Sequence, residues 1–267
     1  TLCCILERMN VYMCLALCCL PFVLCFVFFK MFSSVKISTE LFAGLFGLLA
    51  VLPITFLQFL ITGVVLKQSI SSVSGILPLF LKTVFFNGLI EECVKMMCML
   101  LIPRKKLTFS QFFMAALLCG LCLGCFESVV YFLQYLQSAN ERGARLLYHL
   151  IFARIFSSDI IHTFCAGLCG IFIWSCISKQ IDVWALIFAV LSHGIFNFFA
   201  SFQSNIKWFS VVVILFLLVE TRIHYEKNKP AETYKKDPVP AKSSKDVTIE
   251  SALKDAPAYN PENKGNL

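Results

Sequence analysis

The chain has 267 residues, of which 58% are hydrophobic and only 15% are charged. A soluble domain of this size needs a polar surface that this composition lacks, so the composition argues for a membrane protein. The net charge of +7 suits contact with anionic lipid head groups and gives no specific indication of nucleic acid as a partner.

Apolar stretches of about 20 residues recur along the chain, and a helix needs this length to cross the hydrocarbon of a bilayer. The first is too long for a signal peptide, so we expect a membrane helix there. A half-helix hidden in the long third or fifth stretch would raise the count to eight. The sequence therefore predicts an all-α, multi-pass transmembrane helical bundle of about seven spans, at 11–32, 41–66, 74–102, 111–137, 147–177, 183–201 and 206–221.

Two regions are expected: a transmembrane helical domain at 1–222, with its chemistry in a core at about 75–220, and a tail at 223–267. The tail has too few apolar residues to order itself, so we expect it to be disordered. The positive-inside rule makes the tail side cytoplasmic, in a multi-pass protein of the cell's inner or plasma membrane. Seven spans place on that side Lys30, Lys36, Arg104, Lys105, Lys106 and Lys179.

Ionisable side chains lie in the middle of the third to fifth stretches, where a bilayer makes them expensive. Six of them facing lipid would cost roughly 15–21 kcal/mol, which exceeds the net stability of a typical domain, about 5–15 kcal/mol. We therefore expect these groups to face one another or water in one shared cavity. The six are Glu91, Glu92, Lys95, Glu127, Arg154 and Asp159.

Helical spacing predicts some of the contacts in this cavity. Glu91 and Lys95 are four residues apart and are expected to pair, which leaves Glu92 free for other work. Glu127 shares a face with Tyr131, whose phenol is expected to donate a hydrogen bond to the carboxylate.

The fifth and sixth stretches add two histidines. Asp159 precedes His162 by three residues and is expected to orient its imidazole, and Arg154 is expected to bind a carboxylate. His193 and Asn197 share a face, on which the imidazole can bind a metal or transfer protons and the amide can donate to an oxyanion.

Two carboxylates, two imidazoles and an Asn suit hydrolysis. A glutamate can act as the general base for water, while His and Asn stabilise the tetrahedral intermediate. Alternatively, Glu127, His162 and His193 can hold zinc, because two His and one Glu with an open position form a catalytic zinc site. Glu91 or Glu92 would then carry protons, and the sequence does not choose between zinc and no metal.

These residues also carry a resemblance that covers about residues 75–220. Their order on successive membrane helices resembles the PrsW family of intramembrane proteases, which is related to the type II CAAX prenyl proteases and to the Aph subunit of gamma-secretase. The residues that carry it are Glu91-Glu92-x-x-Lys95, Phe126-Glu127-x-x-x-Tyr131, His162 and His193-x-x-x-Asn197. Lys95 and Tyr131 stand where the CAAX enzymes tend to have Arg and His, so a prenylated substrate is less expected.

The resemblance implies a metalloprotease or a glutamate-type protease that cleaves a membrane-associated protein. The founding activity of the family is site-1 cleavage of an anti-sigma factor, which implies a single-span membrane protein as substrate. By position, Glu91 and Glu92 would be the catalytic acid/base pair and Asn197 the oxyanion donor. The metal ligands or transition-state stabilisers would be Glu127, His162 and His193.

Three rival interpretations are weighed against this one. A non-catalytic scaffold like the Aph subunit would not need the Glu-Glu pair together with both histidines. A proton- or ion-coupled transporter can use Asp, Glu and His chains, but the chain shows no repeated halves. A nucleophilic Cys93 or Cys165 is disfavoured because a buried apolar thiol is inert.

Gly120 and Gly124 form a small-residue motif that predicts close helix packing.

Overall fold

The computed structural model describes residues 11–32, 35–61, 75–104, 107–142, 145–202 and 204–229, and the regular structure within these ranges is helical. The first two helices are α2 (Val11–Phe32) and α3 (Ile37–Phe59). Three pieces then follow end to end, namely α4 (Ile76–Leu81), the π-helix η2 (Lys82–Gly88) and α5 (Leu89–Met99).

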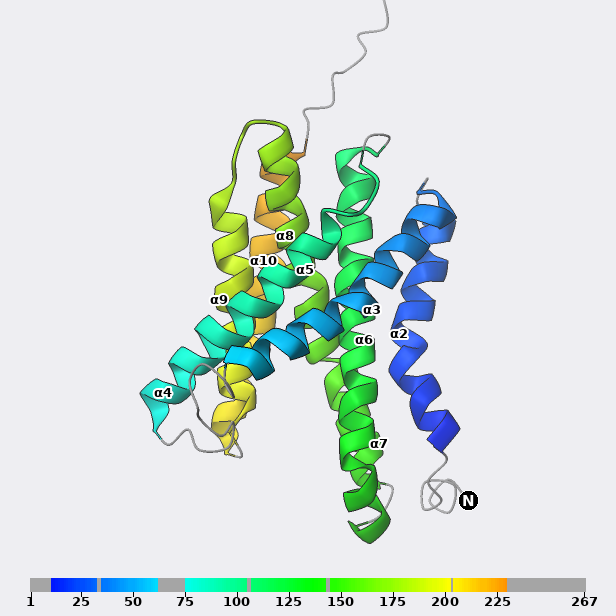
Figure 1. Ribbon diagram of the computed structural model, residues 1–267, viewed down its shortest axis with the longest axis vertical. Helices are drawn as coiled ribbons and strands as arrows, with labels where there is room; N and C mark the ends of the chain where they lie inside the picture. Colours follow the sequence, from blue (N-terminus) through cyan, green and yellow to red (C-terminus); the bar gives the residue numbers. More distant parts are fainter. Residues whose placement is uncertain are drawn as a thin grey trace, which may run out of the picture. The chain divides into compact units, whose positions relative to one another are not determined.

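The second half of the bundle is built around α6 and α8. In chain order it comprises α6 (Phe109–Arg142), α7 (Arg145–Ile155), α8 (Ser158–Ile177), α9 (Val183–Ala200), the 3₁₀ turn η3 (Asn205–Trp208) and α10 (Phe209–Asn228). Figure 1 shows α6 running the length of the bundle, with α2 on one side and α9 and α10 on the other. Side chains of α6 and α8 fill most of the main core, including Phe112, Ala115, Ala116, Leu118, Cys165, Ala166 and Leu168.

Five segments are long and apolar enough to cross a membrane, namely Val11–Met31, Ile37–Phe59, Phe109–Leu136, Leu147–Ile177 and Val183–Ala200. The all-α architecture is confirmed, but the predicted seven spans are not. The third predicted span is divided among α4, η2 and α5, of which the longest has 11 residues. The last predicted span lies mostly in α10, which is not among the five segments and carries Glu220, Arg222 and Glu226 in its second half. The predicted tail from residue 230 onward lies outside the described residues.

One end of the bundle collects the basic residues that the positive-inside rule assigned to the cytoplasm. The end of α2, the start of α3, the connector from α5 to α6 and the turn from α8 to α9 all lie at the upper end in Figure 1. These segments contain Lys30, Lys36, Arg104 and Lys179. Their common location agrees with the predicted distribution of charge, and the cytoplasmic assignment stays a prediction.

At the same end, Asp182 in the turn before α9 ties down the last turns of α10. Its carboxylate lies 2.8 Å from His224 Nδ1, 2.7 Å from Asn228 Nδ2 and 3.1 Å from Lys227 Nζ. Burial raises the pKa of Asp182, but these three partners outweigh burial and hold the pKa below its ordinary value. The cluster explains why the helix continues past the predicted domain boundary at residue 222.

Two glycines on α6 let α8 approach closely enough to bring the polar residues of the two helices together. A Cβ on Gly120 would lie 2.2 Å from the carbonyl oxygen of His162, and one on Gly124 would lie 3.0 Å from the Cα of Asp159. The close packing predicted from this small-residue motif is confirmed. Any larger residue at Gly120 must push the backbone of α8 away, together with His162.

We predict that Gly120→Ala destabilises the bundle, because the added methyl meets backbone that cannot move aside. The expected loss in unfolding free energy is about 1–3 kcal/mol. Gly167→Ala on α8 is the matched control, since its Cβ would meet the flexible end of Leu117 at 2.8 Å. Thermal unfolding in detergent, followed by circular dichroism, measures both variants. Equal midpoints for the two variants would contradict this account of the α6–α8 contact.

Candidate active site

The carboxylate of Glu92 is the central group of a polar cluster between α5, α8 and α9. Glu92 Oε1 lies 2.7 Å from Lys95 Nζ and 2.5 Å from His193 Nδ1. Its other oxygen lies 3.5 Å from the Cys169 thiol. The predicted pair of Glu91 with Lys95 is wrong. Residues three apart share a helix face as well as residues four apart do, and the ammonium pairs with Glu92, the fully buried acid of the two.

Glu91 is the acid of α5 that reaches a cavity. Gln58 on α3 donates a hydrogen bond of 2.9 Å to Glu91 Oε1, and Glu91 Oε2 lies 3.3 Å from His193 Nε2. His193 is thus held between two consecutive glutamates, one at each ring nitrogen. This fixes the plane of the imidazole against α5 without using any group of its own helix.

On α6, Glu127 orients His162 and binds Arg154. Glu127 Oε2 lies 2.7 Å from His162 Nε2 and 2.7 Å from Arg154 Nη2. The guanidinium also stacks over the ring of Tyr131, with its carbon 4.0 Å from the ring centroid. The prediction that Arg154 binds a carboxylate is confirmed. The predicted hydrogen bond from Tyr131 to Glu127 is not found among the described residues, because the arginine lies over the phenol ring.

Asp159 supports this arrangement from behind and does not orient His162 as predicted. Ser128 Oγ donates to Asp159 Oδ1 at 3.1 Å, and Arg154 Nε donates to the same hydroxyl at 3.1 Å. The imidazole of His162 points instead toward α6, where its Nε2 is hydrogen-bonded to Glu127 Oε2. Spacing along α8 could not decide this, because both acids are within reach of that helix and only one lies on the ring's side.

A cavity of about 490 Å³ opens beside the cluster. Five of the predicted site residues line it, namely Glu91, Glu127, Tyr131, Arg154 and Asn197. Four others are buried in the wall behind it, namely Glu92, Lys95, His162 and His193. The rest of the lining is mostly polar and includes Gln58, Lys82, Thr83, Asn87, Ser157, Ser158 and Ser201. The predicted residues are therefore close together, and five of them are open to the cavity.

Three side chains of the cluster form a group that could hold a metal ion. Glu91, His162 and His193 each offer one ligand atom, and these atoms lie within 4.8 Å of one another. His162 Nδ1 is buried and has no hydrogen-bond partner among the described residues, and the two imidazole rings stand edge to face with centroids 4.8 Å apart. The donor set of two His and one carboxylate fits a catalytic zinc site. The structure thus brings Glu91 into the group in place of the predicted Glu127.

Sequence reasoning missed Gln58 and Ser128, which hold Glu91 and Arg154 in place. Gln58 is an amide inside an apolar stretch, so the signal that identified the acids was available for it too. It was overlooked because the first two predicted spans contain no recognised motif. The Ser128 hydroxyl gave no such signal, because serine is common at helix contacts in membranes.

We predict that Lys95→Met destabilises the protein strongly, because it leaves the buried Glu92 carboxylate without its ammonium partner. The expected loss is about 3–5 kcal/mol of unfolding free energy. The double variant Glu92→Gln/Lys95→Met removes the stranded charge and should recover much of this loss. Urea unfolding of both proteins in detergent provides the comparison. A double variant as unstable as the single one would show that Glu92 and Lys95 are not coupled.

Comparison with known proteins identifies the family to which the chain belongs. The sequence model of the PrsW family intramembrane metalloprotease matches residues 36–220, which is more than half of the chain. No curated protein and no solved structure matches the chain. The match begins one residue before α3, so it includes Gln58 as well as the four motif-bearing helices. The chain is a membrane protein that belongs to the PrsW family of intramembrane metalloproteases.

Proposed function

We propose that this protein hydrolyses a peptide bond of a single-span membrane protein, such as an anti-sigma factor, in the cavity between α5, α6 and α9. The observation that carries the proposal is the group of Glu91, His162 and His193, whose ligand atoms lie within 4.8 Å of one another at the cavity wall. Family membership implies an intramembrane protease. The geometry supports this by offering a hydrolytic set of side chains next to a space of about 490 Å³.

We assign Glu91, His162 and His193 as the residues that hold a metal ion, with zinc the best match to the donor set. Each imidazole has one ring nitrogen bound by a glutamate from outside this group of three, His162 Nε2 by Glu127 and His193 Nδ1 by Glu92. The other ring nitrogens, His162 Nδ1 and His193 Nε2, are then the ones left for the ion. A carboxylate behind each imidazole fixes its orientation and makes it a better ligand. Bound metal would polarise the substrate carbonyl and acidify water.

We assign the proton transfer to Glu127. Its Oε2 is held by Arg154 and His162, its side chain is 30% exposed, and the residue lines the cavity. As the oxygen of water bonds to the substrate carbonyl carbon, Glu127 accepts the proton that water loses. It then returns this proton to the amide nitrogen as the carbon–nitrogen bond breaks. Asn197 lines the same cavity and donates to the carbonyl oxygen as negative charge develops there.

A second arrangement of the same cluster hydrolyses peptides without metal. Glu91 would then be the general base, since it is the acid of the Glu91–Glu92 pair that lines the cavity. His193 would donate a hydrogen bond to the intermediate. The two arrangements predict different behaviour of one variant, Glu91→Gln, because only the first makes Glu91 a ligand. Metal content and cleavage therefore have to be measured on the same preparations.

We predict that Glu91→Gln, His162→Ala and His193→Ala lower both metal content and cleavage, while Glu127→Gln lowers cleavage even at saturating metal. Loss of the general base is expected to slow cleavage by about 10²–10⁴-fold. The measurement combines elemental analysis of the purified protein in lipid nanodiscs with cleavage of single-span substrates, with and without chelator. Glu220→Gln, an acid on α10 away from the cavity, is the matched control.

The outcomes separate the two arrangements from failure of the proposal. Cleavage that resists chelator in metal-free protein, yet disappears in Glu91→Gln, would select the glutamate mechanism. Cleavage that persists in all four site variants would show that the reaction does not take place at this cluster. The Glu220→Gln protein should behave as the wild type in each assay, because its acid touches neither the group of ligands nor the cavity.

A further inference from the structure

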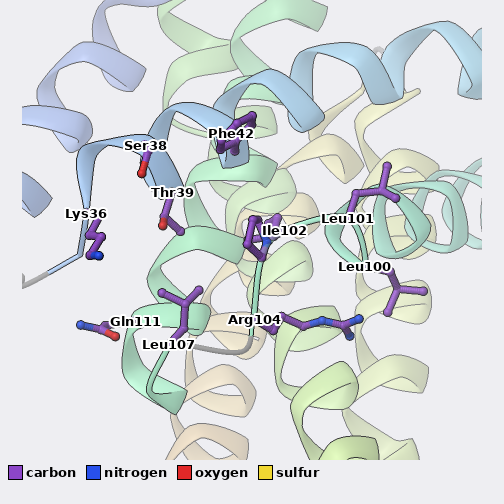
Figure 2. A pocket seen from close by; sticks show the side chains of 11 residues that line it. Lys36, Ser38, Thr39, Phe42, Leu100, Leu101, Ile102, Arg104, Leu107 and Gln111 are labelled. Atoms are coloured by element: carbon purple, nitrogen blue, oxygen red, sulfur yellow. The ribbon is translucent and has the colours of Figure 1, made fainter.

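A second cavity lies at the basic end of the bundle, apart from the proposed reaction centre. Its volume is about 660 Å³, within the range of small-molecule sites. Figure 2 shows that its walls come from two segments, the start of α3 with Lys36, Ser38, Thr39 and Phe42, and the end of α5 with the following connector, which carries Leu100, Leu101, Ile102 and Arg104. Leu107 and Gln111 close it from the side of α6.

The lining combines positive charge, hydroxyl groups and apolar surface. Lys36 and Arg104 contribute two cations, and none of the described residues that line the cavity is acidic. Neither cation has an ion-pair partner within the part of the chain that the structure describes. Glu40, the nearest acid along α3, is 1% exposed and stays out of the lining. Such a lining is complementary to an anion that carries hydrocarbon.

The depth of the cavity identifies the kind of anion. Ile37 and Phe109 are the first residues of two helices that can cross a membrane, and the cavity lies between these two starting points. It is therefore at the level where spans enter the bilayer, which is the level of lipid head groups. Basic pockets between transmembrane helices at this depth bind anionic lipid head groups.

We propose that this cavity binds one anionic phospholipid, with the phosphate on the wall that carries Lys36 and the acyl chain on the apolar side chains, while Arg104 adds positive charge at the far side of the cavity. The hydroxyls of Ser38 and Thr39 lie on the same wall as Lys36 and can donate to phosphate oxygens. Phe42, Leu100 and Leu101 supply the surface for the chain. The site is separate from the proposed catalytic group, so the inference does not depend on the proposed function.

Native mass spectrometry of the full chain, released from micelles with added lipid, tests the proposal. Phosphatidylglycerol and phosphatidylcholine with identical acyl chains are compared. We expect one phosphatidylglycerol to be retained in preference to phosphatidylcholine by the wild type. In Lys36→Gln/Arg104→Gln its binding constant should fall roughly 30-fold, from the attraction that each basic residue contributes. Circular dichroism confirms that the variant is folded.

The matched control is Lys30→Gln/Lys179→Gln, which removes two exposed cations from the same end of the bundle outside the cavity. It should retain the lipid as the wild type does. Equal losses in the two double variants would mean that general surface charge is responsible and would overturn the site. Displacement of the lipid by millimolar inorganic phosphate would show a simple anion site and overturn the lipid assignment. Equal retention of phosphatidylcholine would overturn it as well.

Discussion

The rest of the polar cluster depends on the carboxylate of Glu92, which Lys95 and His193 share. It binds an ammonium of its own helix and an imidazole of α9 at the same time, in a position fully closed to solvent. A charge buried this deeply is tolerated only when its partners are fixed. The consequence is that α5 and α9 have one relative position, and Glu91, the next residue back, is presented to the cavity. Of the two adjacent acids, Glu92 is thus buried and holds the helices together, while Glu91 lines the cavity.

The same division recurs on the other side of the cavity. Glu127 lines the cavity, while Asp159, with the Ser128 hydroxyl between it and Arg154, stays buried and holds the arginine in place. Glu91 and Glu127 thus each have a buried acid near them that does not line the cavity, Glu92 and Asp159 respectively. Because the surroundings are apolar, these supporting contacts are not exchanged with water and can keep the geometry fixed before a substrate arrives.

The sequence was sufficient to predict the helical class and the convergence of the polar side chains, since charges at membrane depth have few places to go. It was not sufficient to predict which acid meets which base. Lys95 can reach either Glu91 or Glu92 from its own helix, and the packing of α5 against its neighbours buries Lys95 with Glu92 while Glu91 lines the cavity. His162 likewise lies near two acids, and the close contact at Gly120 determines the side of α8 that faces α6. Gln58 enters from a helix without a recognised motif. Pairings within a helix follow from spacing, whereas pairings between helices follow from packing that spacing does not encode.

The π-helical turn η2 has a consequence for the wall of the cavity. Lys82, Asn87 and Glu91 all line it, yet Lys82 and Asn87 are five residues apart and would point about 140° away from each other in an α-helix. The wider turn of a π-helix brings residues five apart onto one side. The shape of the cavity wall therefore depends on the one extra residue that the π-helical turn contains relative to an α-helix. Removing that residue would rotate α4 by about 100° relative to α5, so that Lys82 would leave the cavity while both glutamates kept their places.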